Sequence, residues 1–183
     1  MLWVVGVGLR EEHITEEGKK AISRADVVYG SRRAVEVAKR FIRGDIRVME
    51  RFGEEVYRKI EEEGRESEIA VLSTGDPMIA GMGRFFRNAR IVPGISSVQI
   101  ALSRLGVDLC DVVVVNAHSR NDVKAVPGRN LLILARKGVR VEFPGKRIVV
   151  LERLCSEDER VFEVDGNFLV EDDYTIVFVE VVE

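Results

Sequence analysis

Two turn-rich segments indicate how this chain folds: Ser73-Thr74-Gly75-Asp76-Pro77-Met78 and Val92-Pro93-Gly94-Ile95-Ser96-Ser97. Each follows a short apolar run, residues 69–72 or 91–92, of the kind that forms a buried strand. Each precedes a stretch whose apolar spacing is typical of a helix. Ligands of open α/β sheets bind in the crevice outside the carboxyl ends of the strands. The two segments therefore predict a strand–helix fold with a binding site where these strands end.

Strand and helix patterns alternate along the chain as far as residue 105. The expected strands are 2–8, 27–29, 46–48, 69–72 and 91–92. The expected helices are 15–24, 31–41, 54–63, 78–87 and 96–105. Thr15 can cap the first helix, which places Glu16 and Glu17 in a first turn where the helix dipole favours acids. This alternation predicts an α/β fold with a parallel sheet that helices cover on both faces.

After Gly106 the helical pattern weakens and strand patterns dominate. Further strands are expected at 112–115, 131–134, 147–151, 160–164 and 174–182. We therefore expect an N-terminal α/β lobe over residues 1–110 and a β-rich C-terminal lobe over residues 111–183. The segment Leu109-Cys110-Asp111 is too short for a flexible linker, which indicates a hinge between two packed halves.

Composition argues against several functions. The net charge is −3, and from Glu157 to the end ten acidic residues accompany Arg160 alone. Such an acidic run repels a phosphate backbone, so we expect no nucleic-acid partner. Cys110 and Cys155 are too few for a disulfide framework or a zinc site. His13 and His118 offer no cluster for a transition metal, so we expect no metal held by the protein.

The amino terminus shows no targeting signal. Met1-Leu2-Trp3-Val4-Val5-Gly6 has no basic leader and leads directly into a strand, which is unlike a signal peptide. No window approaches the roughly 18 consecutive apolar residues that a transmembrane helix needs. We therefore expect a cytoplasmic protein that does not enter a membrane.

Gly6-Val7-Gly8 follows a strand and suggests a dinucleotide-binding loop, but the pattern fails in detail. The third glycine of that fingerprint would fall at Glu11, whose charge opposes a pyrophosphate. Asp26 stands before the second strand, whereas the fingerprint places an acid at its end. Two interpretations remain open: a glycine-rich exit from the strand, or a loop that lets a ligand approach the backbone closely.

The two opening segments also allow two interpretations each. Asp76 followed by Pro77 is a common helix start, in which the carboxylate only satisfies backbone donors. Alternatively, Asp76 faces a ligand that approaches the backbone at Gly75. Ser96 and Ser97 can cap the following helix or contribute to the same site. Because the G-x-S-x-G pattern is absent, a role for either serine as a nucleophile is not indicated.

Two further polar clusters are candidates for binding. Asn116-Ala117-His118-Ser119-Arg120 follows an expected strand, and His118 is either a surface loop residue or part of a site. Arg32 and Arg33 follow Ser31, the expected cap of a helix. Because cations in a first turn oppose the helix dipole, they suggest an acidic partner elsewhere in the fold or an anionic ligand.

These residues together resemble the tetrapyrrole (corrin and porphyrin) methylases, which use S-adenosylmethionine. The matching stretches are Val4-Val5-Gly6-Val7-Gly8, Ala25-Asp26-Val27-Val28-Tyr29-Gly30, Leu72-Ser73-Thr74-Gly75-Asp76-Pro77 and Ile91-Val92-Pro93-Gly94-Ile95-Ser96-Ser97-Val98-Gln99. Within the family, three stretches resemble the cobalt-precorrin-7 C5-methyltransferase branch, which is the smaller partner in precorrin-6Y C5,15-methyltransferase. These stretches are Gly30-Ser31-Arg32-Arg33, Ala117-His118-Ser119-Arg120, and the segment from Glu152-Arg153-Leu154 to Glu159-Arg160-Val161.

The resemblance implies a two-lobed fold with the cofactor in the cleft between the lobes, usually in a homodimer. It implies S-adenosylmethionine-dependent methylation of C5 in a cobalt-precorrin or precorrin during cobalamin biosynthesis, with any cobalt belonging to the substrate. The resemblance also allows a separate enzyme that methylates and decarboxylates at C15. The implied cofactor contacts are Leu9, Thr74, Gly75, Asp76, Ile79, Ser96, Ser97 and Ala135. The acid arms of the substrate need cationic partners, for which the candidates are Arg33, His118, Arg120 and Arg153.

The chain departs from the family pattern in three places. Leu9-Arg10-Glu11 replaces the usual glycine–aspartate or proline of the first loop, and His118-Ser119-Arg120 replaces His-Gly-Arg. The segment 134–147 lacks the length of the usual helix. Three alternatives therefore stay open: another methylase of this fold such as a diphthine synthase, a non-catalytic cofactor-binding subunit, and a phosphate- or nucleotide-binding α/β enzyme.

Overall fold

A computed structural model describes residues 1–118, 123, 126 and 128–181. The chain divides into two compact units, Met1–Ser97 and Val98–Glu183, and each is described by itself. The division precedes most of helix α4 (Ser97–Leu105), earlier than the boundary after residue 110 that the sequence suggested. Helix α4 groups with the second unit, where its Arg104 forms an ion pair with Glu159 at 2.8 Å.

The first unit contains the parallel sheet that the sequence predicted. Its strands are β1 (Leu2–Gly8), β2 (Val27–Gly30), β3 (Asp45–Val48), β4 (Ile69–Thr74) and β5 (Arg90–Val92). They run in the order β3-β2-β4-β1-β5, and every neighbouring pair is parallel. The central strands β1 and β4 are almost wholly buried, which explains their uninterrupted apolar sequences. All five carboxyl ends therefore meet at one edge.

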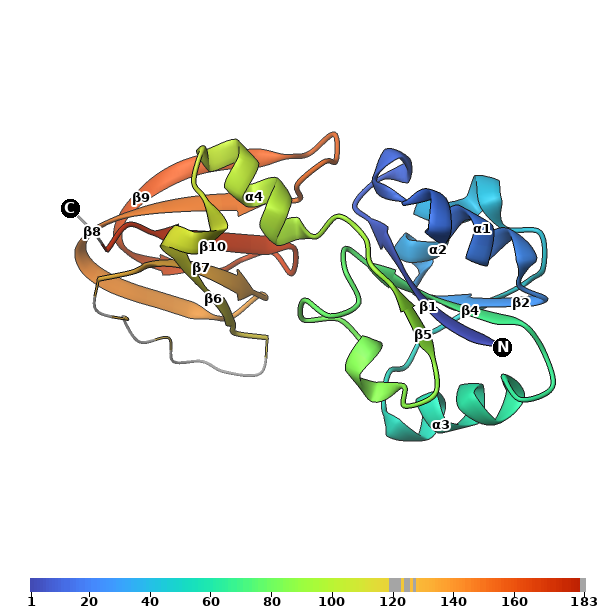
Figure 1. The fold of residues 1–183 in the computed structure, drawn as a ribbon. Coiled ribbons are helices and arrows are strands. Elements are labelled where there is room, and N and C mark those ends of the chain that lie inside the picture. Colours follow the sequence, from blue (N-terminus) through green and yellow to red (C-terminus); the bar gives the residue numbers. More distant parts are fainter. Residues whose placement is uncertain (119–122, 124–125, 127, 182–183) are drawn as a thin grey trace. The chain divides into compact units, whose positions relative to one another are not determined.

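Helices cover both faces of this sheet, as expected. Figure 1 shows α1 (Glu16–Arg24) and α2 (Arg32–Ala38) on one face and α3 (Glu54–Glu63) on the other. The side chain of Thr15 accepts a hydrogen bond from the N–H of Gly18 at 3.1 Å, which confirms the predicted cap. The side chain of Ser31 caps α2 in the same way, at 3.2 Å from the N–H of Ala34. A 3₁₀ turn, Lys39–Phe41, extends α2 to the end of the predicted helix.

The prediction of a helix at 78–87 is wrong. These residues, all of which the structure describes, form turns and one short 3₁₀ helix, Gly83–Phe85. Ala80 has a left-handed backbone, with φ of 54°, which no α-helix contains. A Cβ on Gly81 would lie 2.6 Å from the carbonyl oxygen of Pro77, so the turn is wound too tightly for a helical side chain. The helix-like spacing of the apolar residues misled the prediction.

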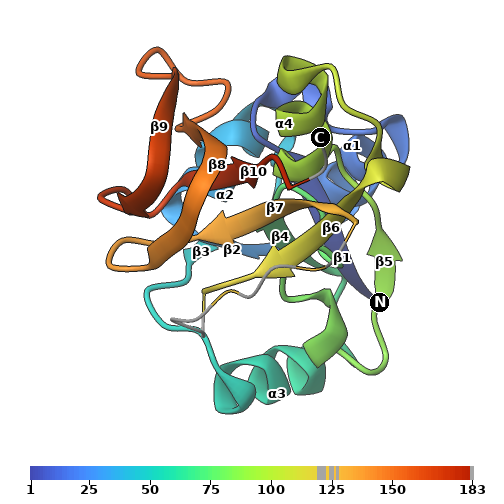
Figure 2. The same cartoon turned by 90° about the vertical axis from the view of Figure 1, so that its left-hand side faces the viewer.

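The second unit is rich in β-structure, as predicted. Its strands are β6 (Val112–Asn116), β7 (Asn130–Ala135), β8 (Arg140–Glu152), β9 (Arg160–Leu169) and β10 (Thr175–Val179). Their order is β6-β7-β10-β8-β9, with β6 and β7 parallel and the remaining pairs antiparallel. Figure 2 shows β8 and β9 as a long, curved hairpin. Strand β8 starts earlier than predicted because it continues through an irregularity between Glu142 and Arg147.

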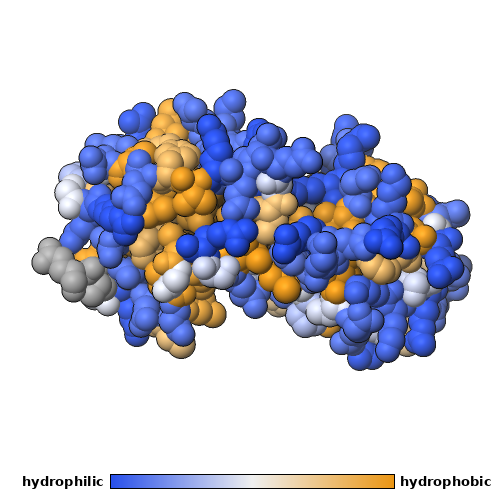
Figure 3. Space-filling view, turned by 90° about the horizontal axis from the view of Figure 1, so that it is seen from above, coloured by the Kyte–Doolittle hydropathy of each residue, from blue (hydrophilic) through white to orange (hydrophobic). Residues whose placement is uncertain are grey.

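The core of the second unit lies against this sheet. Leu131, Ile133, Ile148, Val150 and Val177 are fully buried and pack together. The face drawn in Figure 3 is mostly hydrophilic, with hydrophobic areas between the polar residues, in keeping with a charged-residue content of 32%. Among the described residues, none of the helices is long and apolar enough to cross a membrane.

Candidate functional site

Asp76 connects the two turns that follow β4 and β5. Its Oδ1 accepts a hydrogen bond from the N–H of Met78 at 2.7 Å, as a capping residue would. Its Oδ2 accepts another from the N–H of Gly94 at 3.1 Å, which lies in the next turn of the edge. The half-buried carboxylate therefore serves the backbone with both oxygens. The capping interpretation holds for the Met78 contact, although no α-helix follows Pro77 within the described range 78–87.

Four glycines bring the ends of β1, β4 and β5 into direct backbone contact. Gly8 and Gly75 exchange two backbone hydrogen bonds, at 3.1 and 2.9 Å. A Cβ on Gly94 would lie 2.6 Å from the carbonyl group of Gly6 and 2.6 Å from the carbonyl oxygen of Gly75. A Cβ on Gly6 would likewise lie 2.5 Å from the backbone nitrogen of Gly94, so a side chain at Gly6 or Gly94 would push the turns apart. Gly6 of the first loop is thus required by the approach of the chain's own backbone, and Gly8 by its packing against His13.

The edge built by these turns collects the predicted cofactor residues of the first unit. Leu9 follows Gly8 directly, and Thr74 ends β4. A Cβ on Gly75 would approach only the backbone of Ser97 and Ser96, at 3.7 and 3.8 Å, so these two turns lie side by side. Ile79 is 36% exposed, whereas Ser96 is only 1% exposed. The structure therefore groups the following residues at one edge of the sheet: Leu9, Thr74, Gly75, Asp76, Ile79, Ser96 and Ser97.

His13 supports the first loop, a role that the sequence analysis missed. Its imidazole is buried beneath the loop, and the N–H of Leu9 points at Nδ1 from 3.3 Å. The Nε–H group of Arg10 points at Nε2 from 3.1 Å. Burial lowers the pKa of His13 below its ordinary value, and the positive charge of Arg10 lowers it further. A charged imidazole carries hydrogens on both nitrogens and could accept neither hydrogen bond, whereas the neutral ring can accept one of them. The neutral form therefore stabilises this loop conformation.

In the second unit, strand register brings several predicted residues to another edge. Ala135 ends β7, and Thr175 of β10 pairs with both Ala135 and Glu152, the last residue of β8. His118 follows β6, which ends beside β7. Its Nδ1 lies 2.8 Å from Oδ1 of Asn116, which also accepts the N–H of His118 at 3.1 Å. Because an amide oxygen only accepts, Nδ1 carries the hydrogen and Nε2 is the nitrogen that can take a proton.

The charge state of His118 follows from its surroundings. His118 keeps an exposed surface, but partial desolvation of its ring lowers the pKa of the imidazole. The positive charge of Arg136 lowers this pKa further, while Asp173 acts in the opposite direction. These surroundings favour the neutral form of the ring. His118 then offers a hydrogen-bond acceptor at Nε2, and any fixed positive charge for an acidic ligand has to come from arginine.

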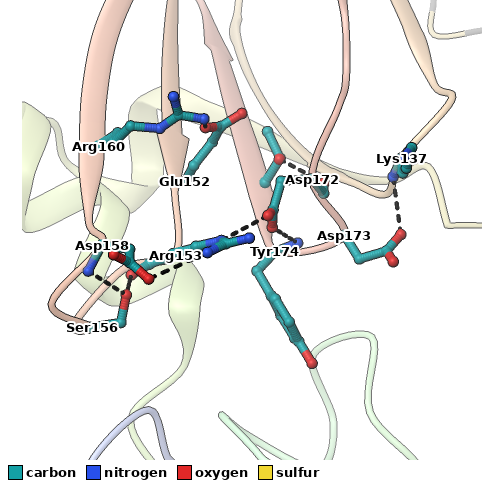
Figure 4. Close-up of polar contacts among 10 residues, drawn as sticks. Lys137, Glu152, Arg153, Ser156, Asp158, Arg160, Asp172, Asp173 and Tyr174 are labelled. Carbon is teal, nitrogen blue, oxygen red and sulfur yellow. Dashed lines mark hydrogen bonds and ion pairs between the residues drawn. The ribbon is translucent and has the colours of Figure 1, made fainter.

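Arg153 is held by carboxylates of its own unit. Its Nε donates to Asp172 at 2.7 Å, and one terminal nitrogen lies 3.3 Å from Asp158 (Figure 4). The neighbouring Arg160 contacts Glu152, which is only 1% exposed. A buried carboxylate needs such a partner, so Arg160 is required wherever Glu152 stays charged. The sequence analysis singled out Arg153 but not the Glu152–Arg160 pair.

The two remaining candidates for the substrate lie elsewhere. Arg33 is in the first turn of α2, which starts where β2 ends, so it belongs to the same edge as the glycine turns. Arg120 lies outside the described residues. Among the described candidates, Arg33 follows the carboxyl end of β2, His118 that of β6 and Arg153 that of β8.

The first edge, which is the carboxyl-end edge of the parallel sheet in the first unit, suits a small ligand that has both polar and apolar parts. Gly75 has φ of 71° and no side chain, which leaves room beside the Ser96-Ser97 turn for another group to approach the backbone. Met78 and Ile79 are exposed next to this turn and offer apolar surface. Pockets for cofactors commonly combine backbone hydrogen-bonding groups with such apolar walls.

Comparison with known proteins gives consistent matches. The family model of the tetrapyrrole (corrin/porphyrin) methylases matches residues 1–167. The precorrin-6Y C(5,15)-methyltransferase (decarboxylating) of Sinorhizobium sp is 32% identical over 186 residues, which span 87% of this chain and 44% of that protein. The probable cobalt-precorrin-7 C(5)-methyltransferase of Methanocaldococcus jannaschii is 28% identical over 188 residues, spanning 88% of this chain and 87% of that protein.

A solved structure is similar as well. The precorrin-6Y methylase from Archaeoglobus fulgidus is 46% identical, with a TM-score of 0.84, and the match covers 98% of this chain and 97% of that chain. This chain thus spans less than half the length of the Sinorhizobium protein but nearly the whole Archaeoglobus chain.

Proposed function

Because the chain belongs to the tetrapyrrole (corrin/porphyrin) methylases, we propose that it methylates C5 of a cobalt-precorrin or precorrin in cobalamin biosynthesis. The observation that carries this proposal is the 46% identity to the Archaeoglobus precorrin-6Y methylase across nearly the full length of both chains. The name of the Methanocaldococcus relative supports the C5 position. The methyl donor of the family is S-adenosylmethionine.

The residues of the first edge fit this donor. S-adenosylmethionine supplies an activated methyl group when it is bound. We propose that it is held by the following residues: Leu9, Thr74, Gly75, Asp76, Ile79, Ser96, Ser97 and Ala135. The exposed apolar side chain of Ile79 and the open backbone at Gly75 support their part in it. Asp76 contributes by fixing two turns, because both of its oxygens already serve the backbone.

Methyl transfer from a sulfonium needs alignment more than acid–base chemistry. Positioning alone can supply much of the rate enhancement of such a reaction. This accounts for a site whose backbone turns are fixed by glycine contacts and one carboxylate. The task of the protein is then to hold the acceptor carbon in line and to keep the turns rigid.

Cationic groups would bind the acid arms of the acceptor. We propose Arg33, Arg120 and Arg153 for this role, because guanidinium groups match carboxylates in geometry. We propose His118 as a fourth group, which binds a carboxylate when Nε2 takes up a proton. The position of His118 at the second-unit edge, with Nδ1 fixed by Asn116, supports its inclusion. Arg153 shares its guanidinium with Asp158 and Asp172, so its contact with substrate would be weaker than that of an unpaired arginine.

We also propose that the enzyme is a homodimer, as the family resemblance implies, and that it acts in the cytoplasm. A separate enzyme would carry out the C15 methylation and decarboxylation. This is supported by the Sinorhizobium relative, in which the match leaves more than half of that protein uncovered. The other candidate functions, a diphthine synthase-like methylase and a non-catalytic subunit, have no observation of their own in their favour.

Two measurements test the proposal. Calorimetry with S-adenosylhomocysteine should show binding with Kd in the range of about 1 to 100 μM, and no binding at millimolar concentration would reject the enzyme. Incubation with S-adenosylmethionine and cobalt-precorrin-7 should yield a product that carries one added methyl group, placed at C5 by NMR. Donor binding without turnover on any precorrin would instead favour the non-catalytic subunit.

A further inference from the structure

A cavity in the first unit lies next to the glycine turns but is not used by the contacts described above. It has a volume of about 320 Å³ and opens among Ser31 at the end of β2, Thr74 at the end of β4, and the loop that contains Ala80 and Met82. All of its lining residues belong to Met1–Ser97. The cavity therefore lies wholly within the first unit, and Thr74 is the one lining residue that it shares with the proposed donor site.

Aromatic rings form one wall of this cavity. Tyr57 of α3 stacks on Phe85, with ring centroids 5.4 Å apart and an interplanar angle of 20°. Phe52 lines the cavity from the segment before α3. Phe52 is 52% exposed and Phe85 is 40% exposed. Leaving two phenyl rings in water is unfavourable, so a flat apolar ligand that covers them would gain from their burial.

Three arginines adjoin residues of this cavity along the chain, and one of them contacts the aromatic wall directly. Arg32, Arg51 and Arg84 each stand next to a lining residue in the sequence, namely Ser31, Phe52 and Phe85. Arg84 lies over the ring of Phe85 at 4.7 Å. Arg32 has one weak ion pair with Glu50 at 3.5 Å, whose partners are both highly exposed. Within the described part of the chain, Arg51 has neither an ion pair nor a hydrogen bond from its side chain.

A ligand for this place must be flat, apolar in its ring and acidic at its periphery. We propose that the cavity binds one pyrrole ring of the tetrapyrrole acceptor with its acid arms, an inference that rests on the proposed function. Phe52 and Phe85 contact the ring, while Arg32, Arg51 and Arg84 bind the carboxylates of the arms. The macrocycle then lies against Thr74, so its edge is next to the proposed donor site.

This assignment makes the aromatic wall a determinant of specificity. The rings of Tyr57 and Phe85 are already stacked without a ligand, so this part of the wall needs little ordering on binding. The arginines select for the number of acid arms, because each guanidinium can bind one carboxylate in a bidentate manner.

The test uses the full chain and a porphyrin with eight carboxylate arms as the probe, followed by absorbance titration. Phe52→Ala and Arg51→Glu are the main variants, because Phe52 is half exposed and Arg51 is unpaired among the described residues, so both should fold. Phe52→Tyr retains an aromatic ring. Arg65→Glu is the matched control, since Arg65 is an exposed arginine that lies between α3 and the amino end of β4, away from the cavity.

We expect Phe52→Ala and Arg51→Glu to weaken probe binding by about tenfold or more, while Phe52→Tyr and Arg65→Glu bind like the unmodified chain. The affinity for S-adenosylhomocysteine should be unchanged in all four. Probe binding that is unaffected by both main variants, or absent in the unmodified chain, would overturn the inference. A matching loss of S-adenosylhomocysteine affinity in both variants would assign the cavity to the donor and also overturn it. The proposed function is judged separately, by donor binding and methyl transfer in the unmodified chain.

Discussion

At the scale of single residues, Asp76 links two turns of the first unit through its carboxylate. Its two oxygens hold the turns after β4 and β5, and each accepts a charge-assisted hydrogen bond. The contact with Met78 follows from the sequence, because aspartate before proline commonly bonds to the backbone two residues on. The contact with Gly94 could not be predicted, since it depends on the order of β4, β1 and β5 in the sheet.

We expect Asp76→Ala to lower the free energy of unfolding by about 2 to 3 kcal/mol, because two backbone donors lose a charged acceptor. Asp76→Asn should cost less, since its amide oxygen can still accept from Met78. Urea denaturation measures both variants, and calorimetry with S-adenosylhomocysteine shows whether binding follows. If Asp76→Ala abolishes binding while the unfolding curve stays unchanged, the carboxylate contacts the ligand and the structural role is wrong.

His13 gives the first loop a dependence on pH. Its pKa in the folded protein lies below the ordinary 6.5, so between these two values the unfolded chain binds a proton that the folded protein rejects. Stability is therefore full above about pH 6.5 and decreases as the pH falls through that window. The sequence gives no sign of this, because the burial of His13 depends on its packing against Gly8.

We expect His13→Gln to remove part of this acid destabilisation. Unfolding should be measured between pH 7.5 and about 5, a range that spans the ordinary pKa of histidine. His118→Gln is the comparison, because the pKa of His118 is lowered as well and contributes its own share. A His13→Gln variant with the same pH profile as the unmodified chain would show that this imidazole is not perturbed.

At the scale of elements, most strands and helices followed from sequence patterns, but the loop after β4 did not. The strand at 2–8 and the helix at 54–63 have the predicted bounds. The strand is almost continuously buried, and the helix has two acidic residues in its first turn and Gly64 directly after its last. Residues 78–87 show helix-like spacing, yet Gly81 and Gly83 lie in a turn held by a hydrogen bond from the N–H of Gly83 to the carbonyl of Pro77 at 2.9 Å. Such a medium-range bond leaves no periodic signal.

Ala80 offers a sharp test of this loop. A left-handed alanine is strained by about 1 kcal/mol or more, which glycine relieves. Because glycine also makes the unfolded chain more flexible, we expect Ala80→Gly to change the free energy of unfolding by about 0 to +1 kcal/mol. Ala101→Gly in the middle of α4 is the contrasting variant and should cost at least about 1 kcal/mol. A similar loss from Ala80→Gly would indicate that 78–87 is helical after all.

At the scale of the whole molecule, the sequence predicted the two-lobed α/β architecture but placed the boundary later than the contacts do. Helix α4 follows the last strand of the first sheet, so the alternation of strand and helix assigns it to the first lobe. Its side-chain contact with Glu159 is formed with a segment far along the chain. The candidate site was predictable where it depends on turn chemistry, as at Gly75, and hidden where it depends on tertiary packing, as at the aromatic cavity.

Each unit has its own core, so damage to one should remain local. Gly94→Ala forces a methyl group to within 2.6 Å of Gly6 and Gly75, which should destabilise the first unit by about 1 to 3 kcal/mol. Arg160→Ala leaves the buried Glu152 without its partner, which should destabilise the second unit by about 2 kcal/mol or more.

Hydrogen exchange followed by mass spectrometry distinguishes these effects. Gly94→Ala should speed exchange in β1, β4 and β5 while β7, β8 and β10 keep their protection. Arg160→Ala should produce the opposite pattern, and adding Glu152→Met should restore protection because the uncompensated charge is gone. Loss of protection across both sheets from either single change would mean that the chain unfolds as one cooperative body. The two units on either side of Ser97 would then be separate in their contacts but would not unfold independently.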